Sequence, residues 1–274
     1  MCQKIKIVFL VVLAFRSLSF SAQEIPIEFL NMNLNTNEVK YSTSVLENEI
    51  AGVNTKHEIL TNGLKEHVAI DHSFKTIYLF IKGNGNLKTK DKTLNIVPET
   101  IFLPNNVKGL YFTPQKNDTL HYIKITVLQT EIDKADIKTF PEDNINNIYF
   151  KKFTDCESYT EPIKSPQTTS RTILPNKIIP RVAMGTVETV GPDRVGAHQH
   201  PMLEQLFLGL TDNQTMVYAD SAQIYFPEYT ILHIPLGSSH SVSVKENNKM
   251  YYVWMDFFRD KKGEAWLKTH KKQK

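Results

Sequence analysis

Residues 191–240 read GPDRVGAHQHPMLEQLFLGLTDNQTMVYADSAQIYFPEYTILHIPLGSSH, and this stretch decides the fold. It places His198 and His200 two residues apart, Glu204 four residues further on, and His240 at its end. Alternate side chains of a β-strand point to one face, so the paired histidines can reach a common point. Imidazoles with a carboxylate suit zinc, iron, manganese, nickel or copper. The stretch therefore predicts a site for one divalent transition metal ion, whose identity stays open.

The order His-x-His-x3-Glu, a variable loop and then Pro-x-Gly-x2-His resembles the two motifs of the cupin superfamily. Cupins fold as a small double-stranded β-helix, or jelly-roll, barrel. The resemblance implies that His198, His200, Glu204 and His240 are the metal ligands. Gln205 follows Glu204 directly, and some cupins place the third ligand one residue later, so the choice between these two residues stays open.

A second copy of the pattern precedes this stretch. An apolar run that leads into Pro-Glu and a later proline occurs at 94–104 and again at 223–235. The repeat is far too long for a solenoid, so it predicts two similar domains in tandem. The expected fold is all-β, with two cupin-like double-stranded β-helix barrels. We expect a degenerate barrel without metal in residues 23–145 and a metal-binding barrel in residues 146–274. The first copy has no His-x-His pair, and a lone His72 is more often a surface or structural residue than a ligand.

Two further strands are expected outside the repeated pattern. A strand is expected around residues 25–30, in the first domain. Residues 131–180 are rich in Lys, Asp, Asn, Thr and Pro, which is typical of an inter-domain region. Within that region, residues 148–153 are apolar and aromatic, and we expect them to begin the sheet of the second domain.

The N-terminus has the layout of a secretory signal peptide in residues 1–22. Lys4 and Lys6 precede an apolar run at 7–15, and small residues follow. A membrane-spanning helix needs about 20 apolar residues, so the run is too short to span. We expect this segment to be removed, the mature chain to be secreted or periplasmic, and no stable membrane insertion to follow.

Charge and cysteine content exclude further classes. Without residues 1–22 the chain carries 29 basic and 29 acidic residues, which is not the electrostatic footprint of a nucleic-acid binder. Cys2 leaves with the predicted signal peptide, and Cys156 then stands alone, so neither an intrachain disulfide nor a cysteine ligand set can form. The cupin resemblance also implies a possible homodimer, because cupins commonly pair through edge strands.

The reaction is less defined than the site. Residues 202–208, 240–242 and 249–255 are similar in layout to the catalytic half of the two-cupin uronate isomerases. This resemblance implies a small-molecule substrate and a metal-assisted isomerisation or lyase-type step on a sugar acid or other carbonyl compound. A non-haem metal-dependent dioxygenase and a non-catalytic sugar-binding or sensory cupin remain alternatives.

A shift of a carbonyl group along a sugar requires a proton shuttle beside the metal. The predicted catalytic residues are Glu204, if it is not a ligand, His233 and Tyr252. Tyr218 and Asp256 are further candidates. Each of these residues could instead have a structural role. Tyr252, for example, lies in a predicted strand that is apolar enough to belong to the core.

Overall fold

The structure is a computed structural model that describes residues 24–33, 40–200, 202–260 and 263. The predicted signal peptide therefore lies outside the described residues. Strands dominate, and the two short helices, α1 (Glu131–Ile137) and α2 (Glu142–Asn146), occur together between the two halves of the chain. No helix within the described ranges is long and apolar enough to cross a membrane.

The first half of the chain supplies the following strands: β1 (Ile27–Phe29), β2 (Lys40–Ser44), β3 (Val53–Thr61), β4 (Glu66–His67), β5 (Phe74–Lys82), β6 (Gly85–Lys88), β7 (Thr93–Ile96), β8 (Thr100–Leu103), β9 (Tyr111–Pro114), β10 (Thr119–Leu128) and β11 (Tyr149–Lys152). Strands β2 to β11 form a large sheet, in the order β11-β8-β5-β10-β3-β2, and a small sheet, in the order β4-β9-β6-β7. Together these two sheets make the first barrel.

The second half supplies the remaining strands: β12 (Ser158–Tyr159), β13 (Thr169–Leu174), β14 (Val182–Val190), β15 (Asp193–His198), β16 (Leu203–Gly209), β17 (Gln214–Ala219), β18 (Ala222–Pro227), β19 (Thr230–Ile234), β20 (His240–Val244) and β21 (Lys249–Phe258). The large sheet of the second barrel has the order β1-β19-β16-β21-β14-β13-β12, and its small sheet has the order β15-β20-β17-β18. A short 3-10 helix, η1 (Phe153–Asp155), precedes β12.

The predicted repeat and the predicted all-β class are confirmed by the strand orders. The run β8-β5-β10-β3 in the first barrel recurs as β19-β16-β21-β14 in the second, and β4-β9-β6-β7 recurs as β15-β20-β17-β18. The turns at the two Pro-Glu pairs also match. The equivalent turn residues are Glu99, which belongs to its Pro-Glu pair, and Tyr229, which follows its pair by one residue; their φ angles are 64° and 51°. The Glu99 N–H donates to the Phe80 carbonyl at 2.8 Å, and the Tyr229 N–H donates to the Gly209 carbonyl at 2.9 Å.

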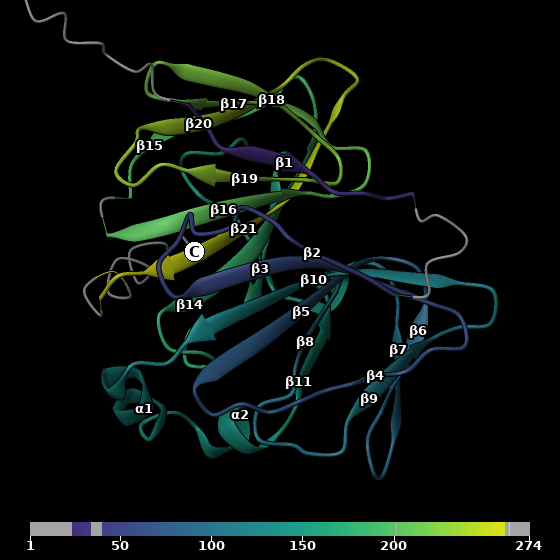
Figure 1. Cartoon of the computed structure of the whole chain (residues 1–274). Helices are drawn as coiled ribbons and strands as arrows, with labels where there is room; N and C mark the ends of the chain where they lie inside the picture. The colour runs from purple at the N-terminus through teal and green to yellow at the C-terminus, as the bar shows by residue number, and fades with distance from the viewer. Residues whose placement is uncertain (1–23, 34–39, 201, 261–262, 264–274) are drawn as a thin grey trace, which may run out of the picture.

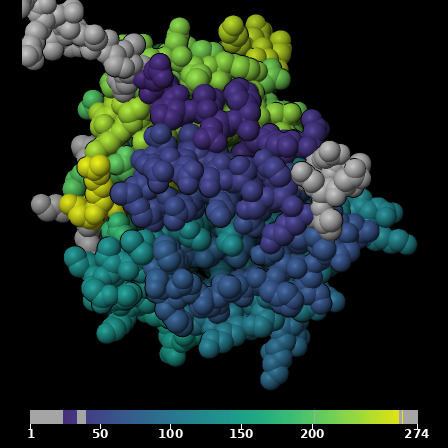
Figure 2. Space-filling model, viewed as in Figure 1, coloured from purple at the N-terminus to yellow at the C-terminus, as the bar shows by residue number. Residues whose placement is uncertain are grey.

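Two edge strands are exchanged between the halves, which differs from the expected domain boundaries at 23–145 and 146–274. Strand β1 pairs with β19 of the second barrel, although it lies at the start of the chain. Strand β11 pairs with β8 of the first barrel, although residues 148–153 were expected to begin the second sheet. Figure 2 shows the purple N-terminal residues lying among the green residues of the second barrel. Each barrel is thus completed by a strand from the other side of the boundary, because an unpaired edge leaves backbone groups unsatisfied.

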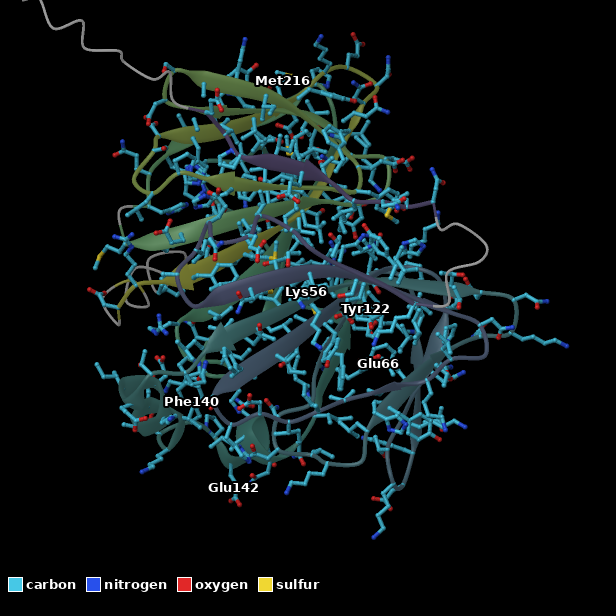
Figure 3. The ribbon with its side chains drawn as sticks, in the orientation of Figure 1. Lys56, Glu66, Tyr122, Phe140, Glu142 and Met216 are labelled. Atoms are coloured by element: carbon cyan, nitrogen blue, oxygen red, sulfur yellow. The ribbon has the colours of Figure 1, made fainter. Side chains whose placement is uncertain are left out.

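The two large sheets pack face to face, so the molecule has four layers with the small sheets outside (Figure 1). Met216 on β17 lies at one end of this stack and Glu142 on α2 at the other (Figure 3). The largest buried cluster fills the space between the large sheets and draws on both barrels. Its members include Ile77, Leu79, Ile123 and Ile125 from the first barrel, and Leu206, Leu208, Val253 and Met255 from the second.

The interiors of the two barrels differ. Aromatic rings from several strands fill the first barrel, with centroids 5.2–6.0 Å apart: Tyr78, Phe80, Phe102, Phe112 and Tyr122, the last labelled in Figure 3. Aliphatic residues and fewer rings line the second barrel, and these leave an open space beside the histidines of β15 and β20. The interior of the first barrel is therefore filled by side chains, whereas the interior of the second barrel contains a cavity.

Candidate metal centre

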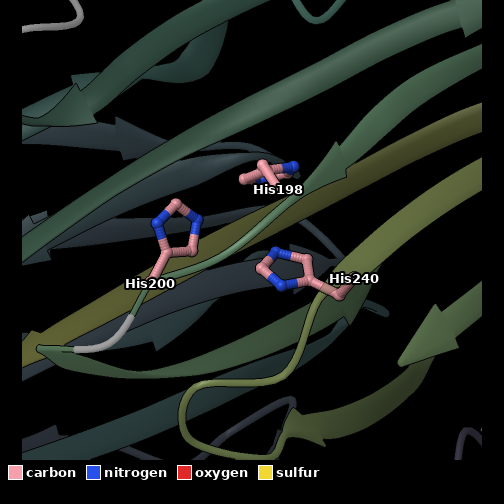
Figure 4. A group of neighbouring side chains, drawn as sticks. All are labelled: His198, His200 and His240. Atoms are coloured by element: carbon pink, nitrogen blue, oxygen red, sulfur yellow. The ribbon is translucent and has the colours of Figure 1, made fainter. Parts of the chain in front are cut away.

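Three imidazoles converge inside the second barrel (Figure 4). His198 ends β15, His240 begins β20, and the two residues lie directly opposite each other in the strand register. His200 follows two residues after His198. The ring centroids lie 4.3 Å apart for His198 and His240, 4.7 Å for His198 and His200, and 5.1 Å for His200 and His240. One nitrogen from each ring lies within 4.8 Å of the other two, as one shared ion requires.

Backbone carbonyls hold two of these rings. The Nδ1 of His198 lies 2.8 Å from the carbonyl oxygen of Gly196, and the Nδ1 of His240 lies 3.2 Å from that of Ser238. Since a carbonyl can only accept, each Nδ1 carries the hydrogen and each Nε2 keeps its lone pair. This is the usual support of a metal-ligating histidine.

His240 is the most deeply buried of the set. Burial, with His198 nearby, lowers the pKa of His240 to about 3, so its imidazole is neutral. Its Nε2 is buried and has no hydrogen-bond partner among the described residues. A buried hydrogen-bond acceptor without a partner destabilises a closed core, so this nitrogen is well placed to bind a metal ion or another ligand.

A cavity of about 500 Å³ extends from the three histidines through the barrel. Its walls are largely apolar and aromatic: Ile163, Val187, Val195, Phe207, Val242 and Trp254. The polar and ionisable groups that face it include Gln205, Tyr252, Asp256, Glu161 and Lys164. A mostly apolar space with a few convergent polar groups is typical of a small-molecule site.

Glu204 does not join the histidine cluster, whereas Gln205 lines the same cavity as the histidines. Strand β16 is buried on both faces. Glu204 shares its face with Leu206 and Leu208, whose side chains pack between the barrels, whereas Gln205 shares its face with Phe207 and lines the cavity. The Oε1 of Gln205 is buried without a hydrogen-bond partner among the described residues. Of the two residues left open by the sequence, Gln205 is therefore the one placed to complete the ligand set.

Glu204 and His233 instead link the two barrels. The Nε2 of His233 lies 3.3 Å from an oxygen of Glu204, and its Nδ1 lies 2.8 Å from an oxygen of Glu49 in the first half of the chain. Arg259 donates to the other oxygen of Glu204 at 2.8 Å. Neither Glu204 nor His233 lines the cavity, so neither is placed to act as the predicted catalytic group there.

Tyr252 and Asp256 do line the cavity, on alternate positions of β21. Asp256 lies opposite Gln205 in the register, and Gln205 Nε2 donates to its Oδ1 at 2.7 Å. Burial raises the pKa of Asp256 to about 7, with the nearby Glu161 adding to the rise and the Gln205 hydrogen bond opposing it. Burial also raises the pKa of Tyr252. Tyr218 alternates with the inward-facing residues of β17 and does not line the cavity.

Sequence reasoning missed Glu161 and Lys164. Both lie between β12 and β13, in a polar run whose composition predicted an inter-domain region, and their side chains are only 9% and 5% exposed. The alternation of Tyr159, Glu161 and Ile163, which all line the cavity, is the signal that could have indicated a buried extended segment here.

The equivalent place in the first barrel has no such cluster among the described residues. The β4–β9 pair corresponds to β15–β20, and the matching turns at Asn117 and Asn247, with φ of 63° and 64°, align Leu110 with His240. Val68 lies opposite Leu110 and donates its N–H to the Leu110 carbonyl at 2.9 Å. His72 lies in an exposed turn before β5. Buried apolar side chains at this place supply no imidazole, which is the physical difference between the two barrels at this point.

Comparisons with known proteins place the fold. No protein-family profile matches the chain, and no curated protein matches it significantly. Among solved structures, a putative glyoxylate-induced protein from Pseudomonas aeruginosa is similar, with a TM-score of 0.65, 9% identity, and coverage of 81% of this chain and 82% of that one. A cupin 2 conserved barrel protein from Leptotrichia buccalis is similar at a TM-score of 0.55 and 12% identity, covering 83% and 92%.

A variant of Bacillus subtilis oxalate decarboxylase is also similar, with a TM-score of 0.58, 10% identity, and coverage of 85% of this chain and 77% of that one. At these identities the likeness concerns the fold, and it extends over both barrels. The strand orders, the histidine geometry and these neighbours agree that the chain has the cupin fold, with two cupin barrels in one polypeptide.

Proposed function

We propose that the second barrel binds one divalent transition metal ion and uses it to transform a small molecule held in the adjoining cavity. The observation that carries this proposal is the convergence of His198, His200 and His240, within 4.8 Å, at the wall of a 500 Å³ cavity. Three imidazoles are a common protein ligand set for catalytic zinc, which keeps a further position open for water or substrate.

The chemistry of the donors fits such an ion. His240 is neutral and presents an unpaired Nε2 from the small sheet, and Gln205 presents an unpaired Oε1 from β16 of the large sheet. Nitrogen and neutral oxygen donors suit zinc, manganese, iron, nickel and copper, so the metal is left open. A bound ion would supply Lewis-acid polarisation of a carbonyl or hydroxyl oxygen.

The residues around the cavity support a metal-assisted isomerisation or lyase-type step on a sugar acid or other small carbonyl compound. A substrate held against the mostly apolar walls would lose part of its hydration, which strengthens polar interactions inside the cavity. Tyr252 and Asp256 face the cavity and can hold or move a proton at the carbons of a bound substrate. Glu204 and His233 take no part in this proposal.

The reaction class is tested by proton exchange. The full chain, loaded with Zn²⁺, is incubated in D₂O with hexuronates and aldohexoses, and NMR follows deuterium incorporation and product formation. Tyr252→Phe removes one hydroxyl from the cavity and should lower the rate by about 10²-fold if that hydroxyl moves a proton. Tyr218→Phe makes the same change outside the cavity and should leave the rate unaltered. Equal rates in the two variants would remove Tyr252 from the mechanism.

A non-haem dioxygenase is the second candidate, because the apolar walls formed by Val195, Phe207 and Val242 would also suit an aromatic substrate. Turnover that requires Fe²⁺ or Cu²⁺ and consumes oxygen in proportion to product would favour it. Turnover with Zn²⁺ and no oxygen uptake would favour isomerisation. A metal-loaded protein that binds ligand without turnover would point to a sugar-binding or sensory cupin instead.

We also propose that the chain is exported after cleavage of residues 1–22, on the sequence pattern alone. Sequencing of the mature N-terminus should find a start near Gln23. An intact Met1 in the mature protein would overturn the export proposal without bearing on the metal.

A further inference from the structure

The segment between β12 and β13, residues 160–168, closes one side of the cavity. Its backbone joins the small sheet beside the histidines: the N–H of Gly196 donates to the Ile163 carbonyl at 2.7 Å, and Lys164 forms an isolated bridge with Val195. The segment that connects the barrels therefore also supplies a wall of the candidate site.

An ion pair on this wall faces the same space as the histidines. The Nζ of Lys164 lies 2.5 Å from Oε2 of Glu161 and donates to Oγ of Ser170 at 2.9 Å. Both charged side chains are almost completely buried, and both line the cavity. Burial lowers the pKa of Lys164, and the Glu161 carboxylate opposes that shift.

The ion pair is not needed to hold residues 160–168 against the second barrel. The carboxylate of Asp193 already accepts hydrogen bonds from Ser165 at 2.6 Å and from Thr168 at 2.8 Å. Buried ion pairs contribute little net stability, because desolvation offsets their attraction. A charged pair beside an open cavity is therefore better explained by what it can bind there.

The chemistry of the pair matches hydroxyl groups. An ammonium has three N–H donors, and Glu161 and Ser170 accept two of those of Lys164. The Tyr159 ring lies 5.6 Å from the Nζ and accepts no conventional hydrogen bond, so the third N–H can turn to a bound molecule. A carboxylate only accepts, whereas a hydroxyl both donates and accepts, so neighbouring hydroxyls can bond to the carboxylate and the ammonium together. The pair has no net charge, which gives it no preference for an anion. Tyr159 and Trp254 add flat aromatic faces to the same cavity.

We propose that Glu161 and Lys164 form the specificity element of the second barrel and recognise adjacent hydroxyl groups of a polyhydroxylated, sugar-like ligand. This inference rests on the proposed function, since it names the substrate class of the same cavity. The histidines would then hold the reacting end of the ligand, and the β12–β13 segment would select the hydroxyl pattern at its other end.

Calorimetry on the full, Zn²⁺-loaded chain tests the inference with three kinds of probe. Aldohexoses of gluco, galacto and manno configuration carry hydroxyls only, the matching hexuronates carry hydroxyls and a carboxylate, and cyclohexanecarboxylate carries a carboxylate on a bare ring. We expect at least one aldohexose and its hexuronate to bind, and cyclohexanecarboxylate not to bind.

Substitutions at the two residues test whether the ion pair is responsible for sugar binding. Lys164→Met and Glu161→Gln should each weaken sugar binding by about tenfold or more, since each removes a charged hydrogen-bonding partner. Lys108→Met, on an exposed loop of the first barrel, should bind as the unaltered chain does. Glu161→Gln keeps the side-chain size, so it serves as the test if Lys164→Met fails to fold.

Metal content measured on the same samples separates this inference from the proposed function. A chain that holds metal but binds no aldohexose or hexuronate overturns the hydroxyl-recognition inference and leaves the metal site standing. Cyclohexanecarboxylate binding as tightly as the hexuronates also overturns it, in favour of a carboxylate site. Sugar binding that depends on Lys164 in a chain that takes up no metal would support the pair and reject the metal.

Discussion

Two adjacent residues show how far residue-scale reasoning reaches in this chain. The sequence limited the third motif ligand to Glu204 or Gln205, and the period of two along β16 places Glu204 on the same face as Leu206 and Leu208. That face of β16 is apolar because it packs against the first barrel, and it does not line the interior of the second barrel. Since both faces of β16 are buried, composition could not indicate which one holds the site.

Two buried histidines between the barrels should make the folded protein less stable in acid. His57 and His121 stack with centroids 5.6 Å apart, and burial lowers the pKa of each to about 4. Between pH 6.5 and about 4 the unfolded chain binds protons that the folded chain does not, so stability should fall as the pH falls through this window. Each histidine can contribute up to about 3 kcal/mol to the loss.

The measurement is urea unfolding of the full chain at a series of pH values between 4 and 7. Changing both residues, His57→Gln with His121→Gln, should flatten the dependence in that window. His72→Gln alters an exposed histidine and serves as the control. An unchanged pH dependence in the double variant would show that these rings do not govern acid stability.

At the scale of elements, the exchanged edge strands were beyond the reach of local patterns. Alternation predicts that residues 25–30 and 148–153 are strands, and both regions contain one. Which sheet accepts an edge strand depends on the unpaired edge that lies nearest in space, and this is set by the packing of the two barrels. The predicted boundary at 145/146 therefore separated β1 and β11 from the sheets that they complete.

This exchange predicts the behaviour of the separated halves. Residues 146–274 alone would lack β1, carry β11 without its partner, and expose their half of the apolar layer between the large sheets. We expect this half to aggregate, because uncovered edges and large apolar faces promote association. Size-exclusion chromatography and circular dichroism would compare it with the 23–274 chain. A monomeric half that unfolds cooperatively would contradict the inferred dependence on β1.

At the scale of the whole molecule, the sequence predicted the class, the duplication and the location of the histidines, because each of these leaves a local trace. It did not predict the four-layer stack, in which one layer of side chains serves both barrels. The same stack explains the errors in the site. Glu204 and His233 are polar residues of the layer between the barrels, where Glu49 meets them, and that contact joins distant parts of the sequence.

Elemental analysis of the full chain, after removal of loosely bound metal, tests the central claim most directly. We predict about one ion per chain for the unaltered protein, near none for His240→Ala, and about one for Glu204→Ala, because only the first substitution removes a ligand. Metal retained in full by His240→Ala, or lost in Glu204→Ala, would contradict the site described for the second barrel.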